Sequence, residues 1–99
     1  MVEEINNIEF ESKTKEGKVL VDCYATWCGP CRMLAPIIEE LASEINECKF
    51  YKLDVDDAED IARNFGIMSI PTLLIFENGE LKQKLVGLMS KEEIKKVLN

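Results

Sequence analysis

The chain has 99 residues, enough for one domain with one modest hydrophobic core, and we expect a single domain over residues 1–99. Hydrophobic residues make up 46% and charged residues 31% of the chain, which excludes a disordered chain and is typical of a soluble globular protein. The 12 basic and 19 acidic residues give a net charge of -7, which argues against nucleic acid and membranes as partners.

The first part of the chain predicts only short elements. Up to Lys18 it has no basic segment followed by an apolar one, so we predict no export signal and expect a cytoplasmic protein. Val2 to Ile5 is predicted as an edge strand, and Ile8 to Lys15 as a short helix. Val19 to Ala25 is mostly apolar and rich in β-branched residues, which predicts a buried central strand with Asp22 inside it.

A long amphipathic helix is predicted after this strand, beginning at the Cys28-Gly29-Pro30-Cys31 motif. Its apolar residues recur at intervals of three and four: Met33, Leu34, Ile37, Ile38, Leu41, Ala42 and Ile45. Phe50 to Val55 is predicted as the next strand. Asp57 is expected to cap a short helix that Gly66 ends.

The last part of the chain predicts a hairpin and a closing helix. Thr72 to Phe76 and Leu81 to Val86 flank Asn78-Gly79, a pair that favours a tight turn between antiparallel strands. Ser90 and Glu93 then form a capping-box pattern. The order β-α-β-α-β-α-β-β-α predicts an α/β fold, with a central mixed sheet of about five strands flanked by about four helices. The cysteine motif would lie where a central strand passes into a helix, a usual place for active sites.

The two cysteines of the motif suit disulfide exchange. The attacking species is a thiolate, and the free N–H groups and positive dipole end of the following helix would favour a negative Cys28 sulfur. Arg32 adds a positive charge, and the chain has no histidine to activate the thiol instead. Cys31 lies one turn further along, close enough to form a disulfide with Cys28. Gly29 leaves the approach open, and Pro30 stiffens the turn.

A zinc site is the main alternative for a C-x-x-C motif. It would need a second pair of ligands, but Cys23 and Cys48 are isolated in the sequence and no histidine is present. We therefore predict no metal site. Cys23 and Cys48 are better explained as buried, unreactive core thiols.

The residues from Val21 to Pro36 resemble the signature of the thioredoxin family. Ile70-Pro71-Thr72, Asn78-Gly79 and Val86-Gly87 resemble its later landmarks, so the resemblance covers nearly the whole chain. It implies the thioredoxin fold and a protein dithiol-disulfide oxidoreductase whose only redox group is a Cys28-Cys31 disulfide. It also implies a monomer that works with a thioredoxin reductase and with oxidised protein substrates, such as disulfide-containing reductases and peroxidases.

The resemblance also implies roles for the residues around the motif. Cys28 would be the exposed nucleophile, Cys31 the buried resolving thiol, and Asp22 the carboxylate that moves a proton to and from Cys31. A buried aspartate is costly unless it is paired or used, which agrees with this role. The alternative is a purely structural pair between Asp22 and Lys52, the matching charge in the Phe50 to Val55 strand.

The later landmarks imply a substrate-binding surface. Pro71 would be a cis-proline facing the cysteines, the alternative being a trans proline that starts an edge strand. The backbone of Ile70 would pair with the substrate chain as an added strand. The resemblance implies that a shallow apolar platform is lined by Trp27, Gly29, Pro30, Ile70, Val86 and Gly87.

Some residues depart from the family pattern. Cys23 and Tyr24 stand where many relatives carry two aromatic residues such as Phe and Trp, and Ser69 stands where glycine is common. An oxidase or isomerase of the same fold is a second possibility, which the Gly-Pro pair between the cysteines disfavours. A binding module without turnover is a third, which the presence of both cysteines disfavours.

Overall fold

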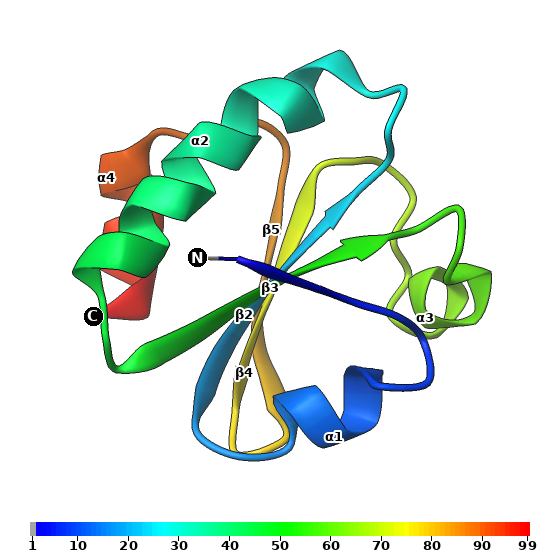
Figure 1. Cartoon of the computed structure of the whole chain (residues 1–99), viewed down its shortest axis with the longest axis horizontal. Coiled ribbons are helices and arrows are strands. Elements are labelled where there is room, and N and C mark those ends of the chain that lie inside the picture. Colours follow the sequence, from blue (N-terminus) through cyan, green and yellow to red (C-terminus); the bar gives the residue numbers. More distant parts are fainter. Residues whose placement is uncertain (1) are drawn as a thin grey trace.

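From residue 2 to residue 99, five strands and four helices follow one another in the predicted order β-α-β-α-β-α-β-β-α, which is therefore confirmed (Figure 1). The computed structural model describes residues 2–99, so Met1 of the predicted domain lies outside the described residues. No helix within this range is long and apolar enough to cross a membrane. The elements are β1 (Glu3–Ile5), α1 (Phe10–Thr14), β2 (Lys18–Tyr24), α2 (Gly29–Glu44), β3 (Cys48–Asp54), α3 (Glu59–Asn64), β4 (Thr72–Glu77), β5 (Glu80–Val86) and α4 (Lys91–Leu98).

The five strands form one mixed sheet in the order β1-β3-β2-β4-β5. Strand β2 is central: it pairs in parallel with β3 and antiparallel with β4. Strand β1 lies at one edge, in parallel with β3, which confirms the predicted edge strand. The mixed sheet predicted from the element order is confirmed.

Helices cover both faces of the sheet (Figure 1). Leu20 and Phe50 pack with residues of α2 and α4, whereas Val19 and Val21 pack with residues of α1 and α3. Side chains alternate between the faces along a strand, so the even-numbered positions of β2 face α2. Asp22 therefore lies on the α2 side of the sheet.

Turn and cap chemistry in the C-terminal half agrees with the sequence. Asn78 and Gly79 have φ values of 52° and 86°, as the predicted hairpin turn requires. The Ser90 hydroxyl accepts the Glu93 N–H at 3.1 Å, and the Glu93 carboxylate accepts the Ser90 N–H at 2.9 Å. The predicted capping box is confirmed. Gly66, with φ of 63°, directly follows the C-cap of α3 as expected.

The expected Asp57 cap is wrong. The N-cap of α3 is Ala58, and no side chain caps this helix. The Asp57 N–H donates to the Asp54 carbonyl at 3.0 Å, so Asp57 belongs to the turn that follows β3. Because that turn occupies Asp57, the helix starts one residue later than the sequence indicated.

The first helix is shorter than predicted. It starts at Phe10, whereas Ile8 lies outside it with its side chain exposed. The Asn6 side chain accepts the Glu9 N–H at 2.8 Å, and the Glu9 carboxylate accepts the Asn6 N–H at 3.0 Å. This reciprocal pair forms a separate turn ahead of the helix and was not predicted.

Candidate active site

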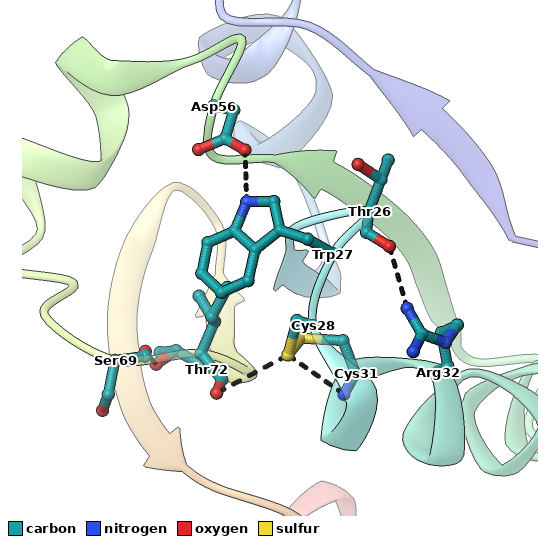
Figure 2. The surroundings of a disulfide bond; sticks show 9 residues. Thr26, Trp27, Cys28, Cys31, Arg32, Asp56, Ser69 and Thr72 are labelled. Carbon is teal, nitrogen blue, oxygen red and sulfur yellow. Dashed lines mark hydrogen bonds between the residues drawn. A yellow bond between two sulfur atoms is a disulfide. The ribbon is translucent and has the colours of Figure 1, made fainter.

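The cysteine motif lies at the start of α2, where the sequence placed it (Figure 2). Cys28 is the N-cap, with extended backbone, and Pro30 falls in the first turn, where its missing N–H costs nothing. A disulfide joins Cys28 and Cys31, whose Cα atoms are 5.3 Å apart. The Cys31 N–H donates to Cys28 Sγ at 3.2 Å. The free N–H groups and the dipole of α2 therefore favour negative charge on the Cys28 sulfur.

Cys28 is as buried as Cys31 in this disulfide form. Their exposed fractions are 5% and 4%, so the expectation of an exposed Cys28 is wrong here. The pair packs with Ala25 and against the partly buried Ile70, which leaves only a small part of its surface free. A Cβ added at Gly29 would meet no atom within 4 Å, so the approach beside the motif is open.

Trp27 and Arg32 are both anchored by hydrogen bonds (Figure 2). The Trp27 side chain is 68% exposed, and its indole N–H donates to the Asp56 carboxylate at 2.8 Å. The Arg32 guanidinium donates to the Thr26 carbonyl at 3.0 Å. Asp56 is a site residue that sequence reasoning missed. The only signal was a run of acidic residues after β3, which does not identify a partner.

The loop before β4 lies next to the disulfide. The Ile70-Pro71 peptide bond is cis, and the Ile70 carbonyl oxygen lies 3.9 Å from Cys28 Sγ. The Gly87 N–H donates to the Pro71 carbonyl at 2.8 Å, which brings the end of β5 to the same surface. Val86, next to this contact, is 57% exposed. The structure thus brings the predicted platform residues of three chain segments together.

Asp22 lies behind the cysteines in a cavity of about 140 Å³ whose walls include Lys52, Tyr24 and Cys31. Its side chain is buried, and its Oδ1 atom has no hydrogen-bond partner among residues 2–99. Burial raises the pKa of Asp22 to about 7, although the Lys52 charge lowers it. A carboxyl with this pKa can both take up and release a proton near neutral pH.

Lys52 is the neighbour of Asp22 in the sheet. Their Cα atoms are paired in the register of β2 and β3. Within the described chain, no ion pair of 4.0 Å or less joins the two side chains, so Lys52 acts on Asp22 at longer range. The two side chains are therefore paired in the sheet register without forming a contact ion pair.

Cys23 and Cys48 are free and buried, as expected for core thiols. Burial raises the pKa of Cys23, and it raises the pKa of Cys48 to about 11. Both thiols are therefore poor nucleophiles at neutral pH. In the part of the chain that the structure describes, no group of three or more cysteine and acidic side chains could hold a metal ion.

The fold is a mixed sheet with helices on both faces. The site is a disulfide at the start of a helix, next to a loop with a cis-proline. Together they define a thiol-disulfide oxidoreductase of the thioredoxin fold. The thioredoxin family model matches residues 1–99. The chain therefore belongs to the thioredoxin family.

Individual relatives cover the chain almost completely. The thioredoxin of Listeria monocytogenes is 50% identical over 100 residues, which span 100% of this chain and 97% of the relative. That of Staphylococcus epidermidis is 45% identical over 96 residues, 96% of this chain and 92% of the relative. A mutant thioredoxin from Halobacterium salinarum has a similar structure, with a TM-score of 0.87 and 34% identity over 97% of this chain and 88% of that chain.

Proposed function

We propose that the protein reduces disulfides of other proteins, with Cys28 as the attacking thiol and Cys31 as the resolving thiol. The observation that carries this proposal is the Cys31 N–H donating to Cys28 Sγ at the start of α2. In the reduced protein the same N–H groups favour the Cys28 thiolate. That thiolate attacks one sulfur of the target disulfide, a new S–S bond joins Cys28 to the target, and the other target sulfur leaves as a thiolate.

The second step returns the chain to the disulfide form. Cys31 attacks the Cys28 sulfur, the Cys28-Cys31 disulfide forms, and the second target thiolate leaves. The target has then gained two electrons, and the protein has lost two. Cys31 must lose its proton to attack, and we assign Asp22 as the base that takes it through their shared cavity. Lys52 has the role of supporting the ionised Asp22 carboxylate.

The substrate chain is proposed to bind over the disulfide. Trp27, Ile70, Pro71, Val86 and Gly87 supply the platform, and the Ile70 backbone pairs with the substrate as an added strand. The closeness of the Ile70 carbonyl to Cys28 Sγ supports this assignment, because a paired strand would then pass beside the reacting sulfur. The open surface at the Gly29-Pro30 turn supports a broad choice of targets.

We assign the cytoplasm as the place of reaction, where cellular systems keep thiols reduced. The chain would act there as a monomeric single domain with no cofactor beyond its own disulfide. A thioredoxin reductase would return the disulfide to the dithiol form. Family membership supports that partner, together with disulfide-containing reductases and peroxidases as substrates.

The reduction potential of the Cys28-Cys31 pair tests the reductant function. Equilibration with glutathione buffers should give a potential below about -220 mV, as cytosolic reduction requires. A potential near -180 mV or above, roughly that of disulfide isomerases, would favour an oxidase or isomerase instead. A variant lacking Cys23 and Cys48 is the matched control and should give the same potential.

A further inference from the structure

Three charged residues lie side by side across the sheet next to the proposed proton path. In the strand register, Glu4 of β1 pairs with Lys52 of β3, and Lys52 pairs with Asp22 of β2. Val2, just before β1, and Phe50 of β3 both pack against the α2 side of the sheet. Side chains alternate between the two faces of a strand, so Glu4, two residues after Val2, and Lys52, two residues after Phe50, face α2 as Asp22 does. Lys52 thus stands between a buried carboxylate and an exposed one, one strand away from each.

Tyr24 connects this row to the active-site cavity. It lies two positions after Asp22 on the same strand face, and it forms part of the wall of the cavity that Asp22 and Cys31 share. Its hydroxyl donates to the Glu4 carboxylate at 2.9 Å. The tyrosine therefore reaches from β2 past β3 to the edge strand β1. The phenol holds the Glu4 carboxylate, and no ion pair of 4.0 Å or less joins Glu4 to Lys52 among residues 2–99.

Within this row, Lys52 supplies the positive charge that lowers the pKa of Asp22. The other cationic side chain of the cavity, Arg32, is held by the Thr26 carbonyl. Strand β4 brings only the apolar Leu73 into register with Asp22. The charged and titratable groups around Asp22 and Tyr24 are Glu4 from β1, Cys23 from β2, Lys52 and Asp54 from β3, and Arg32 from α2. Cys31 also lines the cavity, but it is held in the disulfide and does not titrate in this form.

We propose that Glu4 and Tyr24 are positioning residues for the redox reaction: their hydrogen bond keeps Glu4 from drawing the Lys52 ammonium away from Asp22. This inference rests on the proposed role of Asp22 as the base for Cys31. Without the Tyr24 hydroxyl, the Glu4 carboxylate is free to pair with Lys52 in the neighbouring strand. Without the Glu4 charge, Lys52 has Asp22 as its only carboxylate in the row.

The two residues should therefore shift the titration of Asp22 in opposite directions. Unit charges about 10 Å apart at a protein surface change a pKa by roughly 0.3 to 1 unit. Glu4→Gln keeps an acceptor for the Tyr24 hydroxyl and should lower the Asp22 pKa by about that amount. Tyr24→Phe should raise it by a similar amount. In the Glu4→Gln background, Tyr24→Phe should have no further effect, because no carboxylate is left to compete for Lys52.

Carboxyl-detected NMR titration of Asp22 in the oxidised protein measures these shifts directly. Glu3→Gln is the matched control, because it removes the same charge from β1 at a position that pairs with Tyr51 and faces α1. It should leave the Asp22 titration nearly unchanged. The inference is overturned if Glu4→Gln and Tyr24→Phe leave the midpoint unchanged, or shift it in the same direction. It is also overturned if the Tyr24→Phe shift persists in the double variant, since the tyrosine would then act on Asp22 without Glu4.

The pH profile of the resolving step separates this inference from the function on which it rests. Stopped-flow mixing follows the attack of Cys31 on a preformed mixed disulfide in each variant. If the kinetic midpoint moves with the NMR midpoint, both the inference and the proton role of Asp22 are supported. If the NMR midpoints shift as expected and the kinetic midpoints do not, Glu4 and Asp22 do compete for the Lys52 ammonium, but the proposed role of Asp22 as the base for Cys31 is wrong.

Discussion

Replacing Asp22 by asparagine should stabilise the protein and slow the resolving step. Burial raises the pKa of this carboxyl from the ordinary value of 3.8 to about 7. Each unit corresponds to about 1.4 kcal/mol, so the ionised side chain costs the fold up to roughly 4 kcal/mol. Asparagine also loses hydration in the cavity, and we therefore expect a net gain of about 1 to 4 kcal/mol above neutral pH.

The stability gained by Asp22→Asn should increase as the pH rises. Between pH 3.8 and about 7 the folded protein keeps a proton on Asp22 that the unfolded chain has released. The stability of the wild-type protein therefore falls as the pH rises through this window and levels off above it. The asparagine side chain of the variant cannot titrate, so the stability difference should be near zero at the acid end and reach its full size above pH 7.

Urea melts of the oxidised protein at pH 4, 6 and 8 measure this difference. Asp57→Asn, at an exposed position, is the matched control and should change stability little and equally at each pH. Rapid mixing should show near-normal mixed-disulfide formation by Asp22→Asn and slower resolution near neutral pH. A strongly destabilised variant with unchanged resolution would refute the reasoning and make Asp22 a structural partner of Lys52.

Three further predictions concern other parts of the molecule. Val86→Asp should raise the KM for a protein disulfide about tenfold with kcat nearly unchanged, because it charges the exposed platform; an equal effect on a small disulfide would contradict this. Ser90→Ala should lower the free energy of unfolding by about 1 kcal/mol in urea melts, since it removes a capping acceptor, and an unchanged stability would contradict the cap. Iodoacetamide at pH 8 should label Cys28 of the reduced protein long before Cys23 or Cys48, as followed by mass spectrometry. Rapid labelling of Cys23 or Cys48 would contradict the prediction that these buried thiols are unreactive.

Local patterns predicted most of the fold. The hairpin at Asn78-Gly79 and the capping box at Ser90 depend on residues close in sequence, so their chemistry can be read directly. The predicted Asp57 cap is wrong because a capping side chain must also lie within reach of a free N–H in the first turn of the helix. The turn after β3 shifted the start of α3 by one residue, and this turn left no clear signal in the sequence.

The site was predictable where its parts are adjacent in the chain. Cys28 and Cys31 lie within one helical turn, so the disulfide and its place at the helix start followed from spacing. The bond from Trp27 to Asp56 joins separate elements, and its formation depends on how the loops after β2 and β3 pack. The same holds for the burial of Cys28, because Val55 and Ile70, from distant parts of the chain, pack against it.

Trapping of the mixed disulfide is the most direct test of the central claim, that Cys28 attacks and Cys31 resolves. Cys31→Ser, mixed with an oxidised protein substrate, should accumulate a covalent adduct at Cys28 that mass spectrometry detects. Cys28→Ser should form no adduct and lose disulfide reduction, whereas Cys48→Ser should turn over normally. If Cys31→Ser accumulates no adduct, or if Cys28→Ser keeps normal turnover, the assignment of the two cysteines is wrong.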